Sequence, residues 1–447
     1  MPHDAEPAGG LSRRSFLKLG AAGAAAPLAA ARPDAGGGAV GGSGHSLAGK
    51  PLPPWRRGEF QVHFIYTGVA ESMFWIMPDG TTMLLDCGDH PAWKRGKKSI
   101  WILPDGYRNA GEWIARYVTR VNPGKQDVDY MMISHHHADH AGMENWNAGT
   151  REWNGETLSV GGFLQAADTL RFGHGFDRGW PDFNDPIPDE FCDRNSYPHV
   201  RKTLSYLAER DGMKMERFRV GAADQVALLK DAASFPTFRV VNIAGNGKIL
   251  RRSGEVLDLY ADRHDARKLS ENAMSLGLVA EYGPFRFYTA GDFFGNVKHK
   301  DGTRVDIEVE LAKELGPVDV AKVDHHGHHS MATELVSALR ARVWTACVWD
   351  TAHMTADTLE RLSSREAYPG PRLVAPGVFP PERRLSDAGS PFMADIAPES
   401  FGAGHVVVTV APGGETYTVA YVTADDESML VTGAYDFTSR CGRACQS

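Results

Sequence analysis

The sequence predicts an α/β fold in a single main domain, because strand-length apolar runs alternate with segments of helical period. From Phe60 to Tyr66, apolar and polar side chains alternate as they do in a strand. Between residues 111 and 121, the large apolar side chains recur on one face of a helix. The third observation is a buried strand, residues 128–133, that leads directly into a histidine-rich loop.

The N-terminus has the pattern of a twin-arginine (Tat) export signal, which we place at residues 1–31. Arg13 and Arg14 precede a short run of small apolar residues that ends at Ala31. That run is shorter than the roughly 20 residues of a transmembrane helix, so no stable membrane anchor is expected. The Tat export machinery is therefore a predicted partner, and the predicted location is the periplasm or the medium.

Composition supports a folded protein without a general nucleic-acid-binding surface. Hydrophobic residues make up 42% of the chain and charged residues 23%, which is typical of a globular domain. The whole chain has a net charge of −8, and the signal holds three basic and two acidic side chains, so the remainder is near −9. A uniformly basic surface is not compatible with that balance.

The domain boundaries follow from local composition. Residues 32–58 are rich in Gly and Pro and predict a linker, and residues 59–425 predict the catalytic domain. Its first strands are expected at residues 60–66, 73–77 and 81–86. An insertion is expected at residues 145–235, after the histidine-rich loop, and a C-terminal tail at residues 426–447.

The loop Ser134–Gly142 indicates a metal site. It contains His135, His137, Asp139 and His140, and neutral imidazoles with a carboxylate suit Zn²⁺, Mn²⁺ or Fe. The spacing allows His135 and His137 to bind one metal while Asp139 and His140 bind an adjacent one. We therefore expect two divalent metals, with Zn²⁺ the first choice.

This pattern resembles the metallo-β-lactamase superfamily, and three further motifs occur in the matching order. Met83–Gly88 places Asp86 after an early strand, Tyr288–Asp292 ends in an aspartate, and Val318–Gly327 contains His325 and His326. The resemblance covers residues 59–425 and is greatest to the hydrolase domain of DNA-uptake competence proteins. It implies a four-layer αββα sandwich with the metals at one edge.

The resemblance also implies roles for these residues. Asp292 would bridge both metals, and Asp86 would orient the ligands from behind. We assign His325 to the second metal, because it stands where the strand ends, and His326 to the substrate side as an acid for the leaving group. These two assignments can be exchanged. Asp139 and His326 are the predicted catalytic residues.

One feature departs from the family pattern. Many members have a further metal-binding histidine before the bridging aspartate, but here only His174, His199 and His264 lie between the metal loop and Asp292. His174 is not counted as a ligand. We expect either that water or Asn246 completes the shell of the first metal, or that this metal binds weakly.

The predicted function is that of an exported metal-dependent hydrolase. The two metals would lower the pKa of a shared water, which attacks an electrophilic carbon or phosphorus. The competence-protein subgroup favours a phosphodiester substrate, although other small molecules are compatible with the fold. The alternatives are a β-lactam, ester or lactone hydrolase, and an exported metal-binding protein without catalysis.

Overall fold

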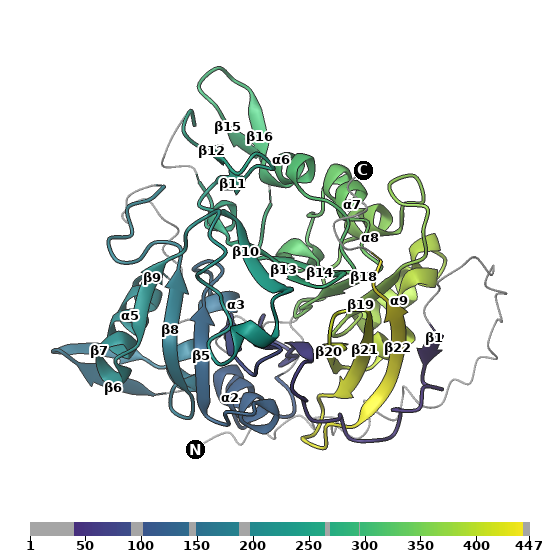
Figure 1. Ribbon diagram of the computed structural model, residues 1–447, viewed down its shortest axis with the longest axis horizontal. Helices are drawn as coiled ribbons and strands as arrows, with labels where there is room; N and C mark the ends of the chain where they lie inside the picture. Colours follow the sequence, from purple (N-terminus) through teal and green to yellow (C-terminus); the bar gives the residue numbers. More distant parts are fainter. Residues whose placement is uncertain are drawn as a thin grey trace, which may run out of the picture. The chain divides into compact units, whose positions relative to one another are not determined.

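Two large β-sheets make up most of the chain (Figure 1). The computed structural model describes residues 40–90, 102–142, 149–186, 197–263, 269–294 and 296–440. All of them belong to one compact unit, Ala39–Ser447. The predicted signal at residues 1–31 lies outside the described residues, and so does His264.

The first sheet has ten strands, and the predicted strands at residues 60–66, 73–77 and 81–86 lie at its centre. Its β4, β5, β8 and β9 run parallel, and the remaining neighbours are antiparallel. Across the sheet the order is β1 (Val40–Gly42), β22 (Val431–Thr438), β21 (Thr416–Thr423), β20 (Gly404–Val410), β2 (Phe60–Phe64), β3 (Met73–Ile76), β4 (Thr82–Leu85), β5 (Asp127–Met132), β8 (Arg171–Asp177) and β9 (Lys214–Arg217).

The second sheet has eight strands, antiparallel from β12 to β14 and parallel from β14 to β19. Across the sheet the order is β12 (Val256–Asp258), β11 (Lys248–Leu250), β10 (Phe238–Gly245), β13 (Gly277–Tyr282), β14 (Phe285–Ala290), β17 (Val320–Lys322), β18 (Val343–Ala346) and β19 (Leu373–Pro376). Two hairpins lie outside the large sheets, β6 (Thr150–Trp153) with β7 (Glu156–Ser159) and β15 (Asn296–Lys298) with β16 (Arg304–Asp306).

The two sheets pack against each other through one apolar cluster. Met83 and Leu85 of β4 belong to it together with Phe287 of β14 and Val320 of β17. The intervening residue of β4, Leu84, belongs to a different cluster because successive strand side chains point to opposite faces.

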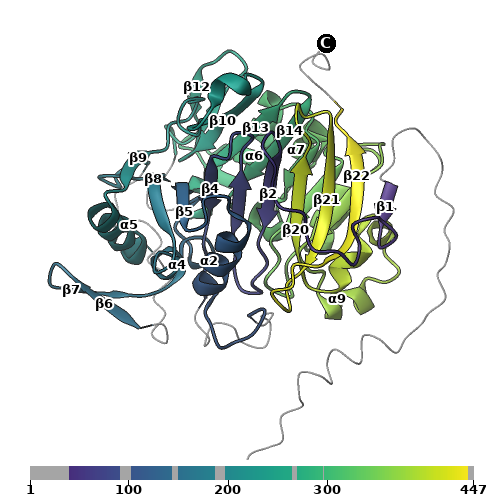
Figure 2. The ribbon, with the colours of Figure 1, turned by 60° about the horizontal axis from the view of Figure 1, so that its bottom comes forward.

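Helices pack against the other faces of the sheets. Figure 2 shows α2 in front of the strands around β4, and apolar residues of α2 share the cluster of Leu84. Leu335 of α7 and Leu359 of α8 share that cluster with Trp344 of β18. The α-helices are α2 (Ala110–Val121), α3 (Ala138–Ala141), α4 (Gly162–Ala166), α5 (Tyr197–Asp211), α6 (Ile307–Glu314), α7 (Thr333–Leu339), α8 (Ala356–Ser363) and α9 (Pro381–Ser386). The predicted mixed α/β class is confirmed.

Three segments differ from the predicted boundaries. Residues 431–438 form β22 rather than a tail, and residues 40–42 in the predicted linker pair with it as β1. Within the predicted insertion, β8 and β9 extend the first sheet beside β5. Buried and exposed positions largely alternate in β22, as they do in a strand. The segment is too short for this alternation to be recognised in the sequence.

No helix in the described part of the chain is both long enough and apolar enough to cross a membrane.

Candidate metal centre

The metal loop is held by backbone hydrogen bonds to the segment that follows β4. The Cys87 N–H donates to the His140 carbonyl at 2.8 Å, and the Asp89 N–H donates to the Ala138 carbonyl at 3.0 Å. Gly88 lies between them, and a Cβ at this position would stand 1.9 Å from the Asp139 carbonyl oxygen. Only glycine allows the two segments to approach so closely.

The loop then directs alternate histidines to opposite sides. His135 and His137 meet on one side, where the His135 Nε2 lies 3.2 Å from the His137 Nδ1. His136 points the other way, and its Nε2 lies 2.6 Å from the Asp177 carboxylate. Asp139 and His140 follow in α3, one short helical turn.

Four side chains, which we call the metal cluster or simply the cluster, converge on a second point beside this pair: Asp139, His140, Asp292 and His326. The His140 Nε2 lies 3.3 Å from the His326 Nε2 and 3.1 Å from the Asp292 Oδ2. The same Asp292 oxygen lies 3.3 Å from the His326 Nε2. The Asp139 Oδ2 lies 3.1 Å from His326 and 3.9 Å from His140.

Four of these five separations lie close to the edge length of a tetrahedron around a metal ion. Zinc–nitrogen and zinc–oxygen bonds of about 2.0–2.1 Å place neighbouring ligand atoms about 3.3–3.4 Å apart. The five distances above run from 3.1 to 3.9 Å and join two imidazole nitrogens and two carboxylate oxygens. This donor set therefore fits a divalent metal such as Zn²⁺.

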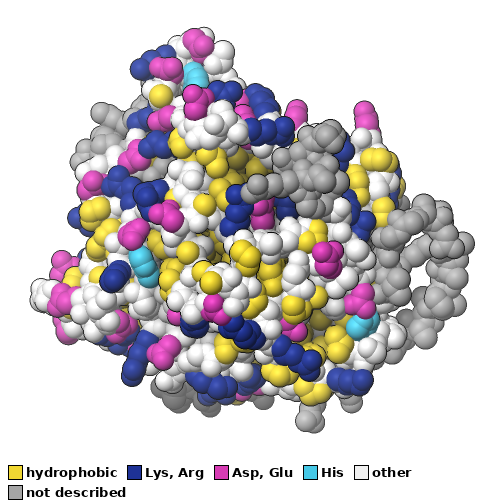
Figure 3. All heavy atoms as spheres, viewed as in Figure 1, with side chains coloured by type: hydrophobic (Ala, Val, Ile, Leu, Met, Phe, Trp, Pro, Cys, Tyr) yellow, Lys and Arg dark blue, Asp and Glu magenta, His cyan; other side chains and the backbone are white. Residues whose placement is uncertain are grey.

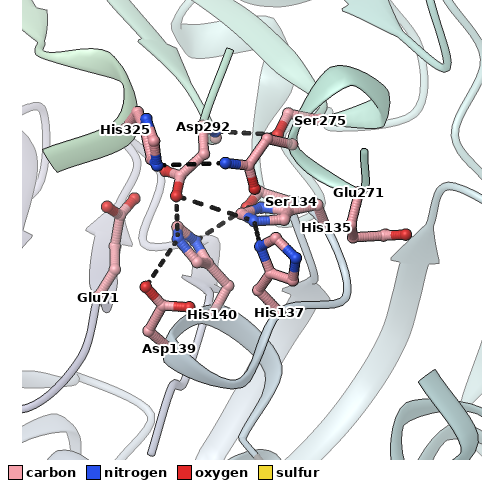
Figure 4. Close-up of polar contacts among 12 residues, drawn as sticks. Glu71, Ser134, His135, His137, Asp139, His140, Glu271, Ser275, Asp292 and His325 are labelled. Atoms are coloured by element: carbon pink, nitrogen blue, oxygen red, sulfur yellow. Dashed lines mark hydrogen bonds and ion pairs between the residues drawn. The ribbon is translucent and has the colours of Figure 1, made fainter. Parts of the chain in front are cut away.

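Asp292 lies between this group and the His135–His137 pair. Figure 4 shows its carboxylate pointing towards His140 and His135, and its Oδ2 lies 3.8 Å from the His135 Nε2. Within the part of the chain that the structure describes, the other oxygen, Oδ1, is buried without a hydrogen-bond partner. The Ser275 hydroxyl accepts a hydrogen bond from the Asp292 backbone N–H at 2.9 Å, which holds the residue in place. A buried carboxylate oxygen without a partner is available to a second cation.

His325 and His326 point in different directions because both have left-handed backbone conformations, with φ of 48° and 52°. His326 reaches the four-residue group described above. The His325 Nε2 instead lies 3.2 Å from the Asn272 side-chain nitrogen, and its ring packs on Phe294. Consecutive left-handed residues without glycine are uncommon and concentrate at functional sites. The structure thus brings His326, rather than His325, to Asp139 and His140.

Asp86 lies behind His140. Its Oδ2 is 2.8 Å from the His140 Nδ1, and the Ser134 backbone N–H and hydroxyl both donate to the same carboxylate. This contact leaves the His140 Nε2 facing the cluster. The arrangement is the one expected of a carboxylate that orients a metal-binding histidine.

Sequence reasoning missed a buried ion pair next to the cluster. Glu71, from the turn between β2 and β3, lies 3.0 Å from the Lys322 ammonium and 3.3 Å from the His326 Nδ1. Lys322 also donates to the carbonyls of Ala290 and Gly291, immediately before Asp292. Glu71, His140, Asp292 and His326 together form a group whose ligand atoms lie within 4.8 Å of one another. Glu71 lies in a turn and Lys322 at the end of a strand, and neither position in the sequence indicates that the two form an ion pair beside the cluster.

A second buried network anchors the far side of the loop. Glu271 accepts a hydrogen bond from the His136 backbone N–H at 2.9 Å and two from the Arg178 guanidinium. The Asp177 carboxylate accepts a hydrogen bond from the Gly179 backbone N–H and pairs with the His136 ring. These contacts fix the loop to β8.

The charges of the cluster require positive compensation. Four buried carboxylates surround the imidazoles, and Lys322 offsets one of them; the four are Glu71, Asp86, Asp139 and Asp292. Burial alone lowers the pKa of His326, but Asp292 and Asp139 outweigh it and raise the pKa to about 9. The pKa of His140 is likewise raised well above its usual value, against burial, by Asp292 and Asp86. Both pKa shifts have the same cause, the carboxylates that surround these imidazoles.

Two residues considered for the first metal lie elsewhere. His174 stacks on Phe176 and pairs with Glu216 at 3.1 Å. The Asn246 side-chain nitrogen donates to the Arg178 carbonyl at 2.8 Å.

His353, in the segment after β18, stacks on the His326 ring at 4.8 Å between ring centres.

Comparison with known proteins finds similarity to solved structures only. No protein-family model matches the chain, and a search of curated proteins also found no match. Among solved structures, a crystal structure of a metal-dependent hydrolase of the β-lactamase superfamily is similar with 14% sequence identity. The match covers 70% of this chain and 95% of that chain with a TM-score of 0.32, which does not assign a family.

Proposed function

We propose that the protein is a metal-dependent hydrolase of the metallo-β-lactamase type, with a four-layer αββα fold. The observation that carries the proposal is the tetrahedral set of Asp139, His140, Asp292 and His326 beside the His135–His137 pair. The Asp292 Oδ2 faces both groups, and its Oδ1 has no hydrogen-bond partner among the described residues, so we propose that this carboxylate serves two ions. We propose two divalent metals, Zn²⁺ first, with Mn²⁺ or Fe as alternatives.

The ligand roles follow from these contacts. We assign to His326 the metal-binding position that sequence order suggested for His325, and the His325 ring packs on Phe294 instead. Asp139 and His140 complete the second site, while His135 and His137 supply the first. When bound, the metals lower the pKa of water towards neutrality and stabilise negative charge that develops on the substrate. Asp86 keeps the His140 Nε2 directed inward.

For the substrate we propose a phosphodiester. The support is the resemblance of residues 272–292 to the competence-protein subgroup, where an Asn-x-x-Ser-Leu hairpin ends in Gly-Asp. The face in Figure 3 has acidic and basic side chains interspersed rather than a basic field. That distribution favours a small phosphodiester over a long nucleic acid. β-Lactam, ester and lactone hydrolysis, or metal binding without turnover, are the competing functions.

The test combines metal content with hydrolysis of bis(p-nitrophenyl) phosphate by the purified protein. We expect two metals per chain and turnover that chelation removes and Zn²⁺ restores. Asp292→Ala should abolish turnover while circular dichroism stays unchanged, and the exposed Asp224→Ala serves as a matched control. Near-normal activity of Asp292→Ala would contradict the bridging role. Turnover of a β-lactam or a carboxylic ester, but not of the phosphate ester, would replace the proposed substrate.

Export through the Tat pathway is proposed from the N-terminal sequence. Replacing Arg13 and Arg14 by Lys should retain the protein in the cytoplasm, because the pathway reads the arginine pair. Fractionation of cells that express the full chain measures the result. Unimpaired export of the double variant would refute the assignment.

A further inference from the structure

The segment after β18 contacts both ring nitrogens of His326. The Cys347 carbonyl lies 2.9 Å from the His326 Nδ1, and the Trp349 indole nitrogen lies 3.3 Å from the His326 Nε2. A carbonyl can only accept, so Nδ1 carries a proton. The Trp349 N–H therefore points at the nitrogen that faces the metal cluster.

His326 accepts from the indole only while its Nε2 lone pair is free. The same Nε2 faces the carboxylate oxygens of Asp139 and Asp292, at 3.1 and 3.3 Å. A cation bound between these three atoms would take the Nε2 lone pair, and none would then remain for the Trp349 N–H. Among the described residues, the indole has no other hydrogen-bond acceptor.

The indole is held in this position by its neighbours. The His353 ring lies perpendicular to it at 4.7 Å between ring centres, and the His90 ring lies at 4.6 Å on a tilted plane. The His353 Nδ1 also faces the backbone N–H of Asp350 at 3.3 Å. A donor that is already oriented loses little entropy when an acceptor arrives.

We propose that the Trp349 indole N–H donates a hydrogen bond to a negatively charged oxygen of the substrate at the metal centre. This inference rests on the proposed hydrolase function and deepens it by naming a substrate-binding donor. The half-buried indole adjoins the cluster, where a substrate oxygen attracted by the cations would lie. An anionic phosphoryl oxygen is the acceptor that this donor and the adjacent cations both favour.

The test uses Trp349→Phe in the full, Zn²⁺-loaded chain, because phenylalanine keeps an aromatic ring and removes the N–H. Isothermal titration with inorganic phosphate measures binding, and atomic absorption measures metal content. We expect the phosphate Kd to rise about 10- to 100-fold, the effect of one hydrogen bond to a charged group, with metal content unchanged. Trp153→Phe, in the β6–β7 hairpin, is the matched control and should bind phosphate normally.

A second measurement follows the indole itself. In ¹H–¹⁵N spectra, the indole resonance that is missing from Trp349→Phe should move when phosphate is added to the loaded wild type. Trp349→Leu replaces the Phe variant if that one does not fold. An unchanged phosphate Kd in the variant, or loss of metal from it, would overturn the inference, since the indole would then only support His326.

The failure of this inference can be told apart from failure of the proposed function. A wild-type protein that binds metal and hydrolyses the phosphate ester, but whose Trp349→Phe variant binds phosphate equally well, refutes the donor role alone. A wild-type protein that binds no metal and hydrolyses nothing refutes both.

Discussion

Replacing Lys322 by Met should strongly destabilise the metal-free protein. Lys322 and Glu71 are both fully buried, and their charged atoms lie 3.0 Å apart. The substitution removes the lysine cation from the buried Glu71 carboxylate, which keeps only the His326 Nδ1 at 3.3 Å beside it, and it removes the hydrogen bonds to the carbonyls of Ala290 and Gly291. Removing one partner of a buried ion pair costs about 3–5 kcal/mol.

The size of the loss in unfolding free energy distinguishes a buried ion pair from an exposed ion pair. Urea unfolding of chelator-treated protein at pH 7 should give a free energy of unfolding lower by about 4 kcal/mol for Lys322→Met. The double variant Glu71→Gln/Lys322→Met should recover most of that loss, because neither charge then remains unpaired. The control is Lys313→Met, which removes a cation that is 59% exposed and paired with Glu310, and which should leave stability unchanged.

A loss below about 1 kcal/mol for Lys322→Met would refute this reasoning, since that is the range of exposed pairs. A double variant as unstable as the single one would also contradict it. The destabilisation would then come from lost packing or backbone hydrogen bonds and not from the unpaired carboxylate.

Three further predictions concern the same centre. The pKa of His326 is raised from 6.5 to about 9, so protonation of its ring stabilises the folded, metal-free protein. This stabilisation of about 3 kcal/mol is complete below pH 6.5 and is lost as the pH rises through 9. Melting curves of the metal-free protein from pH 7 to 10 should show the loss. Asp86→Asn should weaken metal binding about 10- to 100-fold, because the His140 ring loses the carboxylate that orients it. A competition titration with a chromophoric chelator measures the metal affinity, and an affinity equal to that of the wild type would contradict this prediction. Gly88→Ala should lower the metal content, because the added Cβ collides with the Asp139 carbonyl, whereas Gly389→Ala, with open space around it, should bind metal as the wild type does.

The sequence alone predicted which residue types form the candidate metal centre. The spacing of His135, His137, Asp139 and His140 and the position of Asp292 after a strand could be recognised because ligand identity is local information. The strands of residues 60–86, helix α2 and the mixed α/β class could also be predicted, since hydrophobic period reports local structure and burial. Whether both metals bind, and which substrate is hydrolysed, stay predictions.

Only the tertiary structure decided which of two adjacent histidines faces the cluster. His325 and His326 are chemically identical in the sequence, and two consecutive left-handed backbone conformations, stabilised by surrounding contacts, turn His326 inward. Glu71 and Lys322 are 251 positions apart, and they meet because β17 and the turn after β2 end at the same edge of the fold. The direction of a side chain and its long-range contacts depend on the packing of the whole chain. A local sequence pattern therefore predicts neither of them.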